Sequence, residues 1–123
     1  MLFYLDLLHW VGFMSCPSIE ELDLLHAHVC QAFSDPRRML ILYALHEQPQ
    51  NGSKLAAQLE MPQPTVARHL RFLHQRGLLV SSREGRSVVY RLADDRLIEV
   101  IDTMRGLVKT ILTARVNTFR DGE

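Results

Sequence analysis

The sequence predicts a mainly α fold with a small β-hairpin in its second half. Apolar residues recur every three or four positions through most of the chain, as they do on the buried face of a helix. Two β-rich runs, LLVSSRE and SVVYRLA, are joined by the glycine-bearing turn Glu84-Gly85-Arg86. Turn residues such as PQNG separate the helical stretches. A chain of 123 residues with this pattern is expected to form one domain.

The first predicted helix covers SIEELDLLHAHVCQAF, residues 18–33. Ser18 is placed as its N-cap, and Glu21 three residues later completes a capping box. Its apolar stripe consists of Ile19, Leu22, Leu25, Val29 and Phe33. Residues 1–17 are interpreted as an N-terminal extension, with a docking helix and a misassigned start codon as the alternatives. They lack the basic n-region of an export signal.

Three further helices are predicted before the hairpin. Asp35 caps the stretch SDPRRMLILYALHEQ with Pro36 at its first helical position, and the helix is apolar on nearly all sides. After PQNG, Ser53 is expected to cap the short helix KLAAQLE. After the turn MPQ, the helix TVARHLRFLHQR has Pro64 in its first turn and ends at Gly77, expected in a left-handed conformation.

The last predicted helix follows the hairpin and is capped by Asp94 or Asp95. Its apolar residues recur at alternating spacings of four and three, and they are Leu97, Ile101, Met104, Val108 and Ile111. This is a heptad seam, which Arg115 interrupts, and it predicts a self-association surface. Residues 116–123 are expected to form a C-terminal tail.

Charge is concentrated in the middle of a formally neutral chain. Residues 54–91 hold seven bases against two acids, a net of +5, whereas residues 1–53 carry −4 and residues 92–123 carry −1. The basic residues are Lys54, Arg68, Arg71, Arg76, Arg83, Arg86 and Arg91. A basic surface on a neutral protein is typical of polyanion binders.

Two short helices joined by a tight turn, the second one basic, make a helix-turn-helix, and the hairpin that follows makes it winged. An α-helix fits the major groove of B-DNA, where side chains reach base edges. Arginines on a hairpin can reach phosphates or the minor groove. The sequence therefore predicts double-stranded DNA as the partner.

The segments FSDPRRMLILYAL, QPTVARHLRFLHQRGLL and REGRSVVYRL resemble the ArsR (ArsR/SmtB) family of bacterial winged helix-turn-helix regulators, over about residues 20–115. The resemblance implies a DNA-binding and dimerisation domain over residues 18–115, with the N- and C-terminal helices forming the dimer interface. It also implies a cytoplasmic homodimeric repressor that binds a palindromic operator and releases it when an effector binds.

Carried over residue by residue, the resemblance assigns two sets of positions. The DNA-binding set is Ser53, Lys54, Gln63, Thr65, Arg68, His69, Arg71, Arg83 and Arg86. The dimer-interface set is Leu22, Leu25, Val29, Leu97, Ile101, Met104, Val108 and Ile111. The chain departs from the family at Pro64 and Ala67, where serines are frequent, so the operator sequence cannot be inferred from relatives.

Many relatives sense metals, but their usual sites are missing here. The stretch QNGSKLA has no cysteine pair, and residues 94–123 contain neither histidine nor cysteine. The remaining candidates are Cys16, His26 and Cys30, of which the last two share a helical face and suit a soft metal. Pairing across a dimer would bring four thiolates together for a metal or arsenite effector. The alternative makes Cys30 a small buried side chain and His26 a surface residue; no cofactor is required.

Other classes of function have little support in the sequence. It has no glycine-rich phosphate loop, HExxH or serine elbow, so no enzymatic activity is expected. Two cysteines in this length indicate a reducing cytoplasm, and no apolar run reaches the roughly 20 residues that span a membrane. The alternative function is a dimerisation or adaptor module without DNA binding.

Overall fold

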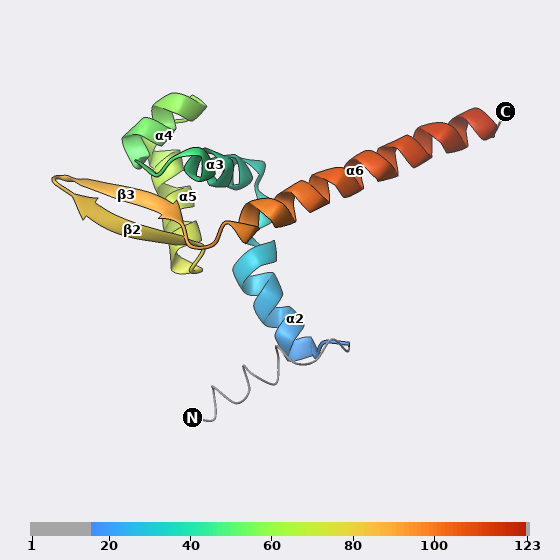
Figure 1. Cartoon of the computed structure of the whole chain (residues 1–123), viewed down its shortest axis with the longest axis horizontal. Coiled ribbons are helices and arrows are strands. Elements are labelled where there is room, and N and C mark those ends of the chain that lie inside the picture. The colour runs from blue at the N-terminus through green and yellow to red at the C-terminus, as the bar shows by residue number, and fades with distance from the viewer. Residues whose placement is uncertain (1–15, 123) are drawn as a thin grey trace.

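The computed structural model describes residues 16–122, so the docking helix considered for residues 1–15 lies outside the described residues. Figure 1 shows the arrangement of the elements. In chain order they are α2 (Ile19–Leu25), the π-helical turn η1 (His26–Cys30), the 3-10 turn η2 (Ala32–Ser34), α3 (Pro36–Glu47), β1 (Gln50–Asn51), α4 (Gly52–Leu59), α5 (Gln63–Gln75), β2 (Leu79–Glu84), β3 (Ser87–Leu92) and α6 (Arg96–Asp121).

Local capping signals fix most helix starts where the sequence predicts them. Ser18 Oγ accepts a hydrogen bond from the Glu21 amide at 3.2 Å, and Asp35 accepts one from the Arg37 amide at 2.9 Å. The predicted cap at Ser53 is wrong. Asn51 Oδ1 accepts from the Lys54 amide at 2.8 Å, so α4 begins at Gly52.

At two further helix ends, the residues that the sequence predicts also satisfy the backbone. Gly77 has a φ of 78° after α5, as predicted for a left-handed C-terminal residue. At the start of α6, Asp94 accepts hydrogen bonds from the amide and the guanidinium of Arg96, at 2.9 and 2.7 Å. The side-chain bonds from Arg96 lower the pKa of Asp94 to about 2.

The first helix is not continuous as predicted. α2 ends at Leu25, and the chain then forms a π-helical turn in which the Gln31 amide donates to the His26 carbonyl at 2.9 Å. The short 3-10 turn η2 follows. Along α2 the apolar Leu22 and Leu25 are 41% and 48% exposed, so nothing within residues 16–122 covers this face.

The sheet has three antiparallel strands in the order β1-β3-β2. β2 and β3 form the predicted hairpin with Glu84 opposite Ser87, and Gly85 in the two-residue turn has a φ of 64°. The two-residue strand β1, which pairs Gln50 with Tyr90, was not predicted. It lies between α3 and α4 in the chain and pairs with the middle of β3.

The hydrophobic core lies where α3, α4, α5 and the start of α6 meet. The largest of its fully buried side chains are Ile41, Leu42, Leu55, Val66 and Leu73. Leu97 and Ile101 also belong to this core, with 8% and 2% exposure. Their predicted place in a dimer interface is therefore wrong, because the first turns of α6 pack against the same subunit.

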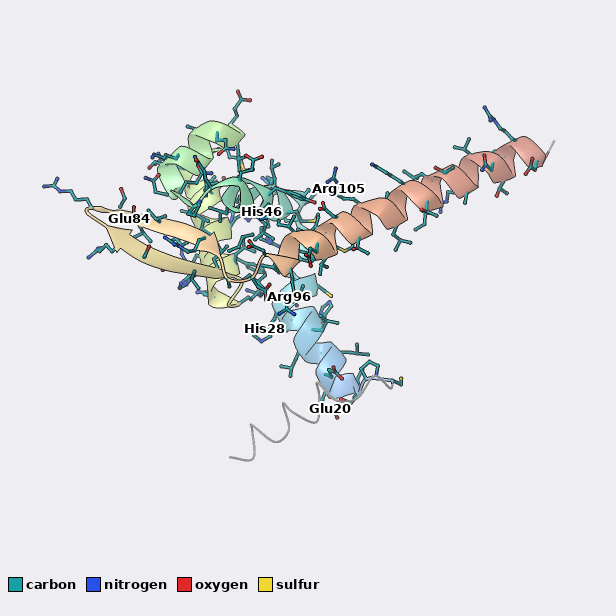
Figure 2. The ribbon with its side chains drawn as sticks, viewed as in Figure 1. Glu20, His28, His46, Glu84, Arg96 and Arg105 are labelled. Carbon is teal, nitrogen blue, oxygen red and sulfur yellow. The ribbon has the colours of Figure 1, made fainter. Side chains whose placement is uncertain are left out.

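Beyond Ile101, α6 leaves the body as a long arm that extends away from the hairpin (Figure 1). The helix continues to Asp121, so most of the predicted tail is helical. Its base is tied to Tyr43 of α3, which donates a hydrogen bond to Asp102 and accepts one from Arg105 Nη1 at 3.4 Å. Figure 2 shows Arg105 on this helix. No helix within residues 16–122 is long and apolar enough to cross a membrane.

Candidate nucleic-acid interface

α4 and α5 form two helices joined by a turn at Glu60-Met61-Pro62. The turn is closed by the Met61 amide, which donates to the Ala56 carbonyl at 3.0 Å. Glu60 has a φ of 53°, the left-handed conformation that lets the chain reverse within three residues. The first two residues of α5, Gln63 and Pro64, are exposed.

α5 has one buried and one exposed side. Val66, Leu70 and Leu73 face the core with at most 2% exposure. The predicted DNA-binding residues Gln63, Arg68 and Arg71 are exposed on the other side, and Thr65 is half-buried. The helix therefore presents polar and basic side chains along an edge that the subunit leaves open.

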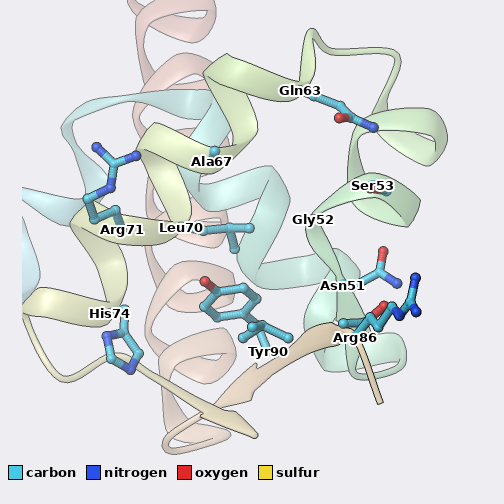
Figure 3. A pocket seen from close by; sticks show the side chains of 12 residues that line it. Asn51, Gly52, Ser53, Gln63, Ala67, Leu70, Arg71, His74, Arg86 and Tyr90 are labelled. Carbon is cyan, nitrogen blue, oxygen red and sulfur yellow. The ribbon is translucent and has the colours of Figure 1, made fainter. Parts of the chain in front are cut away.

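The hairpin and the two helices enclose a cavity of about 470 Å³ (Figure 3). Arg71 reaches it from α5 and Arg86 from the hairpin turn, while Ser53 and Gln63 line it beside them. These four predicted residues come from three separate elements, and the fold brings them to one concave surface. Two guanidinium groups beside polar side chains make this surface suited to an anion such as a phosphate.

The remaining predicted contacts lie around this cavity. Lys54 is exposed in the first turn of α4 and lines a neighbouring cavity of about 480 Å³ together with Arg91 and Glu84. Arg83 is exposed on β2 near the hairpin turn, opposite Val88. Neither Arg68 nor Arg83 lines the 470 Å³ cavity.

His69 does not lie on the exposed edge, and its prediction as a DNA contact is wrong. Its exposure is 3%, and its Nε2 atom is 3.7 Å from Asp35 Oδ2, without a hydrogen-bond partner in the described chain. Burial lowers the pKa of His69, and nearby arginines lower it further, against the opposing effect of Asp35. The spacing of three and four from Val66 to His69 to Leu73 places all three residues on the inner face.

The role of Arg76 was also missed. The charge pattern places Arg76 among the basic surface residues, but in the structure it is half-buried. Its guanidinium carbon lies 3.4 Å from the centre of the Phe72 ring. Arg38 approaches the same ring at 4.1 Å and is only 9% exposed. The adjacent pair Arg37-Arg38 gave no sign in the sequence that one guanidinium would be inside.

The candidate sensor residues are solvent-accessible. Cys16, His26 and Cys30 are all exposed, so the alternative of a buried Cys30 is wrong. No group of three or more metal-ligating residues occurs within the part of the chain that the structure describes. A site shared by two subunits stays a prediction.

A helix-turn-helix followed by a basic hairpin defines a winged helix-turn-helix DNA-binding domain. Residues 35–81 match the family model described as "Bacterial regulatory protein, arsR family". An uncharacterised HTH-type transcriptional regulator of Methanocaldococcus jannaschii is 39% identical over 79 residues, which are 61% of this chain and 85% of that protein. The chain belongs to the arsR family of bacterial regulatory proteins, and it is a winged helix-turn-helix transcriptional regulator.

Two further relatives agree with this membership. The HTH-type transcriptional repressor SmtB of Mycobacterium tuberculosis is 34% identical over 95 residues, covering 72% of this chain and 70% of SmtB. The solution structure of a homodimeric winged helix-turn-helix DNA-binding domain from Mycobacterium bovis superposes with a TM-score of 0.65 at 26% identity. It covers 80% of this chain and 94% of that one. The predicted fold class and family are thus confirmed.

Proposed function

We propose that the protein is a homodimeric cytoplasmic repressor that binds a palindromic operator through α5 and the hairpin. The observation that carries this proposal is that Gln63 and Arg71 of α5 and Arg86 of the hairpin turn line one concave surface. A recognition helix in the major groove would use the exposed edge of α5. The hairpin arginines would then neutralise the adjacent backbone, and the protein would act by binding rather than by catalysis.

Two apolar surfaces that remain exposed in the described part of the subunit support the dimer. One is on α2 and the other on the arm of α6, where Met104, Val108 and Ile111 are 36%, 51% and 47% exposed. Extended exposed apolar patches of this kind mark interaction surfaces. Pairing of like surfaces gives two-fold symmetry, and a two-fold dimer matches a palindromic operator. The Mycobacterium bovis relative is homodimeric.

Binding can be tested with fluorescence anisotropy on the DNA upstream of the gene, measured over a range of salt concentrations. Replacing Arg86 by alanine should weaken binding to all sequences alike and reduce the slope of log affinity against log salt by about one. Arg120→Ala, at the far end of α6, is the matched control and should leave the slope unchanged. Salt-independent affinity, or no affinity, would favour the adaptor function instead.

An effector that reacts with thiols or binds as a metal ion is proposed for Cys16, His26 and Cys30. All three are exposed, and the first and last belong to the N-terminal segment that would meet its copy in a dimer. Cys30→Ser should leave DNA affinity intact and abolish release by arsenite, zinc or an oxidant. Release that persists in this variant would exclude the site.

A further inference from the structure

We infer that Arg76 is a positioning residue that sets the orientation of the recognition helix α5 against the N-terminal helical segment, and thereby the operator half-site spacing that the dimer accepts. This inference rests on the proposed function, because it requires a dimer that binds two half-sites. It is carried by the contacts between Arg76, Phe72, Arg38 and the segment from His26 to Gln31.

The π-helical turn leaves a backbone carbonyl available to Arg76. In a regular α-helix the Gln31 amide would donate to the carbonyl of Ala27, four residues earlier. Here it donates to the His26 carbonyl instead, at 2.9 Å. The Ala27 carbonyl is therefore released from the α-helical pattern and accepts a hydrogen bond from Arg76 Nε at 3.1 Å.

Two more hydrogen bonds join the same pair of elements. Arg76 Nη2 donates to Gln31 Oε1 at 3.1 Å. In return, His28 Nδ1 donates to the carbonyl of Arg76 at 3.2 Å; Figure 2 marks His28 on the N-terminal helical segment. The end of α5 is thus held by three directional contacts, which constrain its rotation as well as its distance.

Stacking on Phe72 connects a third helix, α3, to α5 and the N-terminal segment. The Phe72 ring of α5 lies between the guanidinium groups of Arg76 and Arg38, at 3.4 and 4.1 Å. Arg38 of α3 in turn donates from Nε to the Ala32 carbonyl and from Nη2 to the Gln31 carbonyl, both at 2.9 Å. Planar guanidinium groups suit this combination of stacking and forked donation, whereas an ammonium group does not.

The consequence for DNA binding is geometric. The N-terminal segment carries part of the proposed dimer surface, and α5 carries the proposed base contacts. A rigid connection between them fixes how far apart the two copies of α5 lie, and a helix-turn-helix dimer needs about one helical turn, 10 to 10.5 base pairs, between half-site centres. Because its guanidinium is engaged inside the subunit, Arg76 is not available as a phosphate contact.

The test uses the full chain and an operator selected by the wild-type protein from random duplexes. Affinities are then measured by anisotropy for operators whose half-sites are moved closer or further apart by one and two base pairs. The wild type should lose about tenfold or more in affinity at a two-base-pair change, about 1.4 kcal/mol. Arg76→Ala should bind the selected spacing a few-fold more weakly and discriminate between spacings by less than about threefold.

Two matched variants distinguish a role of Arg76 in positioning α5 from a role of its charge in binding phosphate. Arg76→Lys keeps the charge but loses the fork and the stacking, so it should show the same loss of spacing discrimination. Arg71→Ala, at the exposed surface of the same helix, should lower affinity at every spacing and reduce the salt slope by about one, with the spacing preference retained. Phe72→Leu removes the stacking alone and provides a second reading if Arg76→Ala folds poorly.

The outcomes are distinct. An unchanged spacing preference in Arg76→Ala, Arg76→Lys and Phe72→Leu overturns the inference. A salt slope reduced by about one in Arg76→Ala also overturns it, because Arg76 would then be a phosphate contact. If the wild type selects no DNA, the proposed function fails instead.

Discussion

At the scale of single residues, His69 and Asp35 form a contact that charge counting cannot reveal. His69 is buried near Asp35 and close enough to Arg37, Arg38 and Arg68 to be affected by their charges. Burial is the largest influence, so the pKa of His69 is lowered from its ordinary value of 6.5 in spite of the carboxylate. The imidazole is therefore favoured in its neutral form in the folded protein.

This gives a prediction for stability against pH. Above pH 6.5 the imidazole is neutral in both the folded and the unfolded chain. As pH falls below that value, the unfolded chain takes up the proton first, so the free energy of unfolding decreases. His69→Leu removes this decrease, so its stability relative to the wild type should stay constant from pH 8 to about pH 6.5 and rise as the pH falls further to 5.

Urea denaturation at several pH values measures the effect. His26→Gln, at an exposed histidine, is the control and should follow the wild type. A constant difference between His69→Leu and the wild type over this range would contradict the assignment of His69 as a buried neutral group.

Residue-level predictions from the sequence succeeded for apolar positions and failed for some polar ones. Val66, Leu70 and Leu73 were recognised by their spacing, because burial of apolar side chains follows helical periodicity. His69 and Arg76 were assigned to the surface by residue type. His69 lies near Asp35, and Arg76 donates to the Ala27 carbonyl; the spacing within α5 does not reveal these contacts with distant parts of the chain.

At the scale of elements, helix starts depend on which nearby side chain reaches the free amides. Asn51 was overlooked because it lies in PQNG, which reads as a turn, whereas the serine two residues later matches the usual cap preference. In the structure the same asparagine belongs to β1 and caps α4. Its conformation depends on pairing with β3, which a local pattern cannot show.

The cap assignment predicts a difference between two neighbouring substitutions. Asn51→Ala should lower the free energy of unfolding by about 1 kcal/mol, because the Lys54 amide loses its acceptor. Ser53→Ala, at an exposed position inside the first turn, should change it by less than about 0.5 kcal/mol. Thermal or urea denaturation of both variants measures the two values. Equal losses would mean that Ser53 shares the capping.

The sequence pattern also does not predict the π-helical turn. SIEELDLLHAHVCQAF has a regular apolar stripe that favours one continuous α-helix. The interruption coincides with the carbonyls of Ala27, Gln31 and Ala32, which accept hydrogen bonds from Arg76 and Arg38. Elements fixed by tertiary contacts of this kind cannot be located from periodicity alone.

At the scale of the whole molecule, the predicted heptad seam of α6 divides into two parts. Its first positions, Leu97 and Ile101, are core residues, while Met104, Val108 and Ile111 lie on the free arm. The arm has further exposed apolar side chains on both sides of Arg115: Leu112 before it, and Val116 and Phe119 after it, which are 55%, 55% and 83% exposed. The seam was predicted correctly as a pattern, but a pattern does not show which part is covered by the same chain.

This division predicts two different outcomes for the same kind of substitution. Ile111→Asp should convert the dimer to folded monomers, because it places a charge on the exposed apolar surface of the arm. Ile101→Asp should unfold the subunit, because an unpaired charge in the core costs more than 3 kcal/mol, of the order of a domain's stability.

Sedimentation equilibrium and circular dichroism distinguish the two results. Thr113→Asp, also exposed on α6 but about 200° around the helix from Ile111, is the control and should remain dimeric. A dimer that survives Ile111→Asp would place the interface elsewhere.

The free arm of α6 also has a consequence for behaviour on dilution. α6 has 26 residues, about 39 Å of helix, and beyond Ile101 its side chains are exposed in the described subunit. In the proposed dimer this arm would gain its contacts from the second copy. Assembly and folding are then linked, so the melting midpoint should climb with the amount of protein in the sample. Where free monomers predominate, the dimer population varies with the square of the monomer concentration. Operator occupancy would then respond to synthesis of the regulator more steeply than in direct proportion.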